Sequence, residues 1–168
     1  MATEGREGAA PEHLSRALRT SGFYVLRTGW DKDAAVTVVK AGPLAFWHNQ
    51  PDNGTFDYWR RGRNFFPDSG CYTYTTGSTR NKYAASTAHN TVTLNGKNVS
   101  GEGRMLLQES KSTSSFDYEV LVLENPSYAN LTHRRAVFMV ADKFYVILDE
   151  AYGSAEGTVN LNFNITEG

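Results

Sequence analysis

Short runs of alternating apolar and polar residues make up most of the chain from Phe23 onward. They are rich in valine, threonine, tyrosine and phenylalanine, and glycine, proline, asparagine and aspartate separate them, which is the pattern of strands joined by turns. No long segment keeps a helical period. The alternation predicts ten strands, over 22–28, 35–40, 54–59, 63–67, 91–94, 104–111, 118–124, 132–140, 144–149 and 158–165.

Tight turns indicate how neighbouring strands pair. Residues 141–143 separate two strongly apolar runs and residues 60–62 separate two shorter ones, so each segment predicts a hairpin. Asn95 and Gly96 both tolerate a positive φ and predict a further turn. Short antiparallel strands spaced in this way are typical of a β-sandwich. We therefore expect an all-β fold, an antiparallel and supersandwich-like β-sandwich.

The two ends of the chain differ from this middle part. Residues 1–20 begin as a polar stretch and could form a short helix after Pro11, so we expect a tail or linker there and the sandwich domain over 21–168. The last alternating run stops at Ile165, three residues before the chain does. We expect the sheet to be incomplete and the chain to be part of a longer protein.

Composition narrows the classes of function. A chain of 168 residues, 40% of them hydrophobic, can bury one sizeable core. Its formal net charge of -1 and the lack of a recognised motif argue against nucleic-acid binding. No apolar run is long enough to predict a membrane span. Cys71 is the single cysteine, and a packed small side chain is a better interpretation of it than a catalytic thiol.

Polar residues of the kind used in catalysis gather in three loop-like segments, 47–54, 67–70 and 88–91. Histidine, aspartate and asparagine held between apolar strands are what a site on a rigid scaffold requires. If the backbone around His48 is extended, His48 and Gln50 point to the same face, which could then hold a base and a ligand. By spacing alone, a structural loop histidine bonded to the backbone remains an open alternative.

The same segments have counterparts in a known family. They run Phe46-Trp47-His48-Asn49-Gln50-Pro51-Asp52-Asn53-Gly54-Thr55-Phe56, then Gly62–Gly70, then Thr87–Leu94, with supporting matches at 22–31, 125–131 and 133–135. In these segments the chain resembles the heparinase II/III family of polysaccharide lyases, and the resemblance extends from about Pro11 to the end. It implies the β-sandwich part of a two-part enzyme, whose N-terminal α/α toroid forms the other wall of the cleft.

The resemblance implies a reaction. Family members cleave acidic, uronate-containing polysaccharides by β-elimination: a base removes the proton beside the carboxylate, a neutralised carboxylate stabilises the enolate-like intermediate, and an acid protonates the leaving oxygen. His48 stands at the place of the catalytic histidine, as base or base-assisting group. The partner tyrosine and asparagine would lie on the toroid. Heparan sulfate or a related glycosaminoglycan is the implied substrate, and the periplasm or the cell exterior the implied location.

The resemblance also implies a divalent metal between the sheets, with Asp68 and His89 at ligand positions. Gln50 stands where one member carries a further histidine, which disfavours zinc and leaves calcium or a weaker site open. If a metal binds, we expect it to orient the loop that bears His48. The alternative is that Asp68 caps the Ser69-Gly70 turn and that His89 is a satisfied histidine between strands.

Substrate contacts are expected from a further set of residues in and around these segments. Arginine forks suit sulfate and carboxylate groups, and tyrosine rings can stack on sugars, although such arginines also occur on solvated hairpins and such tyrosines in cores. The set comprises Asn49, Asn53, Arg63, Arg80 and Tyr83. For the chain as a whole, the alternative is a non-catalytic carbohydrate-binding β-sandwich module. A zinc hydrolase is disfavoured because no His-Glu-x-x-His segment occurs.

Overall fold

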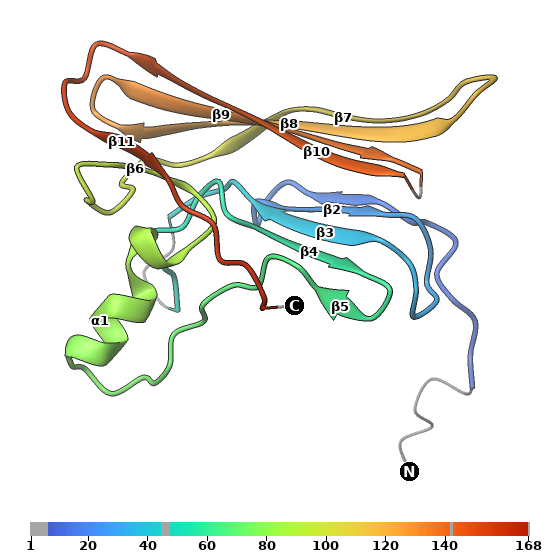
Figure 1. Ribbon diagram of the computed structural model, residues 1–168, viewed down its shortest axis with the longest axis horizontal. Helices are drawn as coiled ribbons and strands as arrows, with labels where there is room; N and C mark the ends of the chain where they lie inside the picture. Colours follow the sequence, from blue (N-terminus) through green and yellow to red (C-terminus); the bar gives the residue numbers. More distant parts are fainter. Residues whose placement is uncertain (1–6, 45–47, 142, 168) are drawn as a thin grey trace.

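Two antiparallel sheets pack face to face in the computed structural model, which describes residues 7–44, 48–141 and 143–167 (Figure 1). The first sheet has the order β1-β2-β3-β4-β5, formed by Arg16–Leu18, Phe23–Arg27, Val36–Lys40, Phe56–Arg60 and Arg63–Asn64. The second has the order β10-β9-β8-β7, formed by Phe144–Gly153, Leu131–Val140, Asp117–Tyr128 and Arg104–Ser112. The expected all-β sandwich is confirmed.

The core lies between these two sheets because alternate residues of each strand point inward. Buried side chains from the first sheet meet buried side chains from the second; they are Tyr24, Leu26, Val39, Phe56 and Tyr58 on one side and Leu121, Leu123, Val137 and Met139 on the other. The ring of Tyr145 stacks on that of Tyr58, with centroids 3.9 Å apart. Burial of these apolar side chains is the main favourable contribution to folding.

The expected turns are present where the structure describes them. Residues Arg60 and Arg63 pair across the β4–β5 hairpin, and Phe144 pairs with Val140 across the β9–β10 hairpin. Within the latter turn, Asp142 lies outside the described residues. Asn95 and Gly96 have φ values of 53° and 67°, the left-handed conformation that their turn requires.

Three segments differ from the sequence-based expectation. The short helix after Pro11 does not form; instead Arg16–Leu18 is strand β1, because its backbone pairs with β2 and tertiary pairing overrides a weak local preference. Residues 1–6 of the expected tail lie outside the described residues. A seven-residue helix, α1 (Ser78–Ala84), was not expected, and since it buries no residue it leaves no apolar period to detect. The final strand, β11, covers only Val159–Leu161.

A small third sheet and the helical turns lie at one end of the sandwich (Figure 1). Strand β11 pairs with β6 (Val92–Leu94), which follows the 3₁₀ turn η1 (Ser86–Ala88). Buried polar groups fix this end: Nη1 of Arg135 donates to the carbonyls of Gly54 and Asn90, at 2.6 Å each. Arg135 on β9 thereby joins the second sheet to the two loops that carry the candidate chemistry.

Candidate functional site

A hollow of about 270 Å³ opens at one end of strands β2, β3 and β4 of the first sheet, beside the loop between β3 and β4. Its lining combines an apolar floor with a cation, a histidine, an amide and several carboxylates, namely Phe23, Val38, Lys40, His48, Gln50, Asp52, Thr55, Phe56, Asp57 and Asp68. The structure thus brings His48, Gln50 and Asp68 to one hollow, although twenty positions separate the first from the last. His89 contacts this group through Asp68.

His48 is presented at the mouth of the hollow with an unusual backbone. Its φ of 54° lies in the left-handed region, which histidine adopts more readily than most residues but still uncommonly. The residue is exposed, and its ring meets the ring of Tyr74 edge to face with centroids 5.1 Å apart. An exposed imidazole held against an aromatic ring can accept a proton from a bound molecule. Trp47 lies outside the described residues.

Asp68 and His89 form a hydrogen-bonded pair at the inner wall. Nδ1 of His89 donates to Oδ2 of Asp68 at 2.8 Å, and the His89 side chain is completely buried whereas that of Asp68 is 35% exposed. The other Asp68 oxygen accepts the backbone N–H of Gly70 at 2.7 Å. Although partial burial tends to raise the pKa of Asp68, the hydrogen bond from His89 and the smaller contributions of other neighbours lower it overall, so the carboxylate is ionised at neutral pH.

The donor set around this pair fits a divalent cation. Ligand atoms of Asp52, Asp68 and His89 all lie within 4.8 Å of one another. Two buried atoms, Nε2 of His89 and Oε1 of Gln50, have no hydrogen-bond partner in the described part of the chain. An imidazole whose one nitrogen donates to a carboxylate while the other keeps its lone pair is the usual arrangement of a ligating histidine. Asp52 was not among the expected ligands.

Asp57 adds a carboxyl group with altered acidity to the same wall. Burial raises the pKa of Asp57 to about 6, and the negative charge of Asp68 contributes in the same direction. Its own backbone carbonyl accepts the hydroxyl of Thr37 at 2.7 Å, which fixes the strand position. A cation bound at Asp68 would favour the ionised form of Asp57.

The asparagines expected to contact substrate have different surroundings. Oδ1 of Asn49 accepts a hydrogen bond from Nζ of Lys40 at 2.9 Å, at the edge of the hollow. Asn53 departs from the expectation, because it is only 1% exposed and its amide is engaged by backbone groups. Oδ1 accepts from the Gly42 N–H, and Nδ2 donates to the carbonyls of Gly42 and Gly101, each at 3.0 Å. Asn53 is a scaffold residue that anchors the loop.

The remaining expected substrate residues lie outside the hollow. The guanidinium of Arg63 donates to the carbonyls of Thr166 and Glu167 at 3.1 and 3.0 Å, so it binds the C-terminal segment. Arg80 donates to the Thr73 carbonyl at 2.6 Å and lies 5.2 Å from the ring centre of Tyr74, the ring that contacts His48.

Tyr83 on α1 stacks against Tyr72, with ring centroids 5.5 Å apart, and Tyr72 is 71% exposed. This pair and the half-buried Arg80 form an aromatic and basic surface, which is linked to His48 through Tyr74. Tyr72 and Tyr74 were missed by sequence reasoning because they fall in a segment without period or motif. The role of Lys40 was equally hidden, since it reads as the polar end of a strand.

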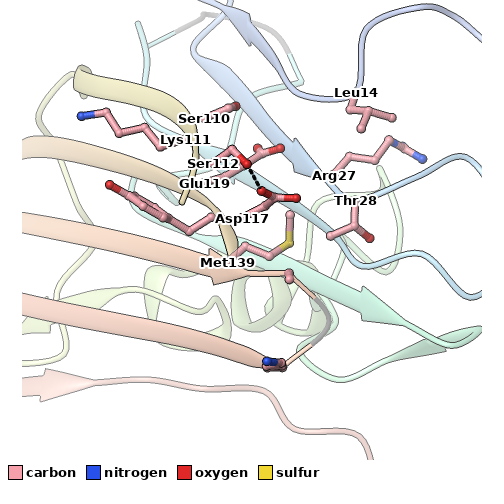
Figure 2. A pocket seen from close by; sticks show the side chains of 12 residues that line it. Leu14, Arg27, Thr28, Ser110, Lys111, Ser112, Asp117, Glu119 and Met139 are labelled. Carbon is pink, nitrogen blue, oxygen red and sulfur yellow. Dashed lines mark hydrogen bonds between the residues drawn. The ribbon is translucent and has the colours of Figure 1, made fainter. Parts of the chain in front are cut away.

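A larger cavity, of about 690 Å³, lies between β2 and the strands β7–β9 (Figure 2). Figure 2 shows Arg27, Glu119 and Asp117 around it, with Ser112 hydrogen-bonded to Asp117. Burial raises the pKa of Glu119, which accepts a hydrogen bond from Ser15. None of the sequence-predicted site residues lines this cavity. Its lining, as far as the chain is described, contains no histidine, so the hollow beside His48 is the better candidate for proton transfer.

The fold and this site define a β-sandwich domain that presents a histidine beside an acidic cluster, and the family follows from comparison. The family model described as "Heparinase II/III-like, C-terminal" matches residues 10–168. The chain belongs to this family.

Particular relatives are similar over the whole chain. It is 47% identical to a heparin-sulfate lyase of Bacteroides stercoris, in an alignment that covers 100% of this chain and 25% of the relative. It is 40% identical to a heparin-sulfate lyase of Pedobacter heparinus, in an alignment that covers 99% of this chain and 26% of the relative. Among solved structures, a heparinase III has a TM-score of 0.89 at 46% identity, over 99% of this chain and 26% of that one. The heparan sulfate lyase of Pedobacter heparinus has a TM-score of 0.86 at 39% identity, over 98% and 26%.

The chain therefore spans about a quarter of the length of the curated relatives it matches. Among the described residues, no helix is long and apolar enough to cross a membrane.

Proposed function

We propose that this chain is the β-sandwich part of a polysaccharide lyase that cleaves heparan sulfate or a related uronate-containing glycosaminoglycan by β-elimination. The observation that carries the proposal is the exposed His48 at the mouth of a polar hollow. The relatives that match this chain over nearly all of its length are named heparin-sulfate lyases. A protein that only binds carbohydrate would not need an exposed histidine at a position with a strained backbone.

His48 acts as the base in the proposed reaction. It takes the proton from the carbon beside the uronate carboxylate, the electron pair of that bond forms the new carbon–carbon double bond, and the glycosidic oxygen on the next carbon leaves with a proton from an acid. Because a carbon acid is weak, the carboxylate must be neutralised as the proton departs. The acid and the neutralising group belong, on this proposal, to the part of the longer protein outside this chain, an N-terminal α/α toroid.

The exposed surface beside His48 would hold the polymer. Arg80 offers a guanidinium for a sulfate or carboxylate group, while the Tyr72–Tyr83 pair offers an aromatic face for a sugar ring. Asn49 follows His48 in the chain and accepts a hydrogen bond from Lys40, and its side-chain NH₂ group can contact a sugar hydroxyl. The charged groups and the sugar rings of the polymer would thus each find a complementary side chain on this surface.

A divalent cation bound by Asp68, His89 and Asp52 is part of the proposal, with Gln50 as a further oxygen donor. Oxygen donors from two carboxylates and an amide favour calcium, and the imidazole is compatible with zinc. When bound, the cation would supply structural order to the loop and neutralise the acidic wall. The proton transfer itself is carried by His48.

The longer protein is expected in the periplasm or outside the cell, where acidic polysaccharides are met. Cell fractionation of the source organism tests this location directly. Recovery of the protein only from the cytoplasmic fraction would contradict it.

The test of function is the ultraviolet absorbance of the unsaturated uronate product, measured with the full-length protein on heparan sulfate, heparin, chondroitin sulfate and alginate. We expect the wild type to produce the signal and His48→Ala to lose it. The matched control is His13→Ala, which removes an exposed histidine far along the sequence from the hollow. The 168-residue chain by itself should yield little product, because it lacks the acid and the neutralising group.

Two results would overturn the proposal. One is a wild-type protein that releases no unsaturated product from any of the four polymers. The other is undiminished turnover by His48→Ala. Tight binding without turnover would instead favour a carbohydrate-binding module, which the exposed Tyr72 and Tyr74 would suit.

A further inference from the structure

Lys40 is a mostly buried cation whose ammonium group contacts the loop that carries His48. It is the last residue of β3 and pairs with Phe23 of β2. Its backbone is held on the other side as well, because its N–H donates to Thr55 at 3.0 Å and its carbonyl accepts from Gly54 at 2.7 Å. The side chain is only 13% exposed. The backbone from which this side chain extends is therefore fixed by the sheet.

The ammonium group of Lys40 reaches three neighbours of His48. Nζ donates to Oδ1 of Asn49 at 2.9 Å and to the carbonyl of Gln50 at 3.3 Å, and it also donates to the carboxylate of Asp52. An ammonium has three N–H donors, so these contacts use all of them. The acceptors belong to residues one, two and four positions after His48.

This arrangement restrains several residues of the loop at once, whereas a simple ion pair would hold only one side chain. An ion pair needs only the Asp52 carboxylate, whose side chain is 12% exposed. The other two acceptors are neutral and lie closer to His48 in the chain. Since His48 itself has a left-handed backbone at φ 54°, its conformation needs support from its neighbours.

We infer that Lys40 is a positioning residue for His48: its ammonium fixes residues 49–52 so that the imidazole is held at the mouth of the hollow. This inference rests on the proposed function, in which His48 is the base. Lys40 does not itself touch the reacting atoms. Its removal should leave the imidazole present but no longer held in place, which affects the chemical step more than substrate binding.

The kinetic test uses the full-length protein and the unsaturated-product assay. For Lys40→Met we expect kcat to fall by about ten- to a hundredfold, the loss typical of small misplacements, with a much smaller change in KM. Lys40→Cys treated with 2-bromoethylamine regains an ammonium at nearly the same reach and should recover most of the lost kcat. Wild-type protein treated in the same way controls for modification of Cys71.

A second variant separates positioning from stability. Lys40→Met leaves the Asp52 carboxylate buried without its counter-charge, which can destabilise the fold by itself. In Lys40→Met/Asp52→Asn both charges are gone, so the melting temperature should return toward that of the wild type. Its kcat should stay well below that of Asp52→Asn alone, which lacks the same proposed cation ligand but keeps the ammonium. A loss of positioning should lower kcat by more than about twofold. If the double variant folded stably and turned over substrate within about twofold of the wild-type rate, the inference would be overturned.

A readout without turnover distinguishes failure of this inference from failure of the proposed function. In protein labelled with ¹³C-histidine, the ring signal of His48, assigned by its loss in His48→Ala, should be a single sharp resonance. In the double variant, but not in Asp52→Asn alone, it should shift and broaden as the loop becomes mobile. An unchanged signal would overturn the inference even if the wild type were a proven lyase, and a changed one would support it even if no polymer were cleaved.

Discussion

Replacing Asp149 by asparagine should lower the free energy of unfolding of the 168-residue chain by about 2 to 3 kcal/mol at neutral pH. Oδ1 of Asp149 accepts hydrogen bonds from Nε of Arg135 and from Nε2 of His133, both at 2.7 Å. Oδ2 accepts a hydrogen bond from Nη2 of Arg135 at 3.0 Å. Arg135 is completely buried and the Asp149 side chain is 11% exposed. Loss of the carboxylate charge would therefore leave a buried guanidinium without its counter-ion.

The magnitude follows from the acidity of this carboxyl group. Burial alone would raise the pKa of Asp149, but the hydrogen bonds from His133 and Arg135 and the Arg135 charge outweigh it and lower the pKa to about 2, from 3.8. One pKa unit corresponds to about 1.4 kcal/mol, so the ionised form gains about 2.5 kcal/mol in the folded protein. Asp149→Ala, which also removes the hydrogen-bond acceptors, should cost about 3 to 5 kcal/mol.

The pH dependence has a definite sign. Because the folded pKa is depressed, the unfolded chain binds more protons between the two values. The contribution of Asp149 is thus complete above its unfolded pKa and is lost as the pH falls from 3.8 toward about 2. The difference in unfolding free energy between wild type and Asp149→Asn should shrink over that window.

Urea unfolding followed by circular dichroism, at neutral pH and through the acidic range, measures both effects. The matched control is Glu150→Gln on the next position of β10, whose exposed side chain lies 3.5 Å from Arg134 and should change stability by less than about 0.5 kcal/mol. If Asp149→Asn behaved like this control, or if its difference from wild type were independent of pH, the reasoning would be refuted.

Two further predictions concern the loop and the cation. Gly54→Ala should destabilise the chain by about 2 to 4 kcal/mol in the same urea assay, since φ is +92° and the new Cβ would lie 2.8 Å from Oγ1 of Thr91 and 2.9 Å from Nδ1 of His133. Gly62→Ala, with a similar φ and open space around it, should cost only about 1 kcal/mol, and equal costs would contradict the argument. Asp68→Ala should weaken binding of calcium or zinc by at least about tenfold in isothermal titration calorimetry. Asp33→Ala, an exposed carboxylate elsewhere, is the control, and equal affinities for the two variants would exclude Asp68 as a ligand.

Relations that act over short distances in the chain were predictable from the sequence. The period of two in the runs that became β8, β9 and β10 marks which side chains face the core, and the hairpin at 60–62 follows from turn chemistry alone. The segments that resemble the lyase family identified His48, Asp68 and His89 as candidates, because a motif is a local property of the chain.

Only the tertiary structure decided how these candidates are placed. It made Arg16–Leu18 an edge strand. It also buried Asn53, which was expected to contact substrate, and bonded its amide to backbone groups. It placed Lys40 under the His48 loop, and it set Arg135 against carbonyls from loops 81 and 45 positions away. The physical reason is that these arrangements depend on hydrogen bonds and ion pairs between groups remote in sequence, and such bonds form only after the two sheets have packed and excluded water from the space between them.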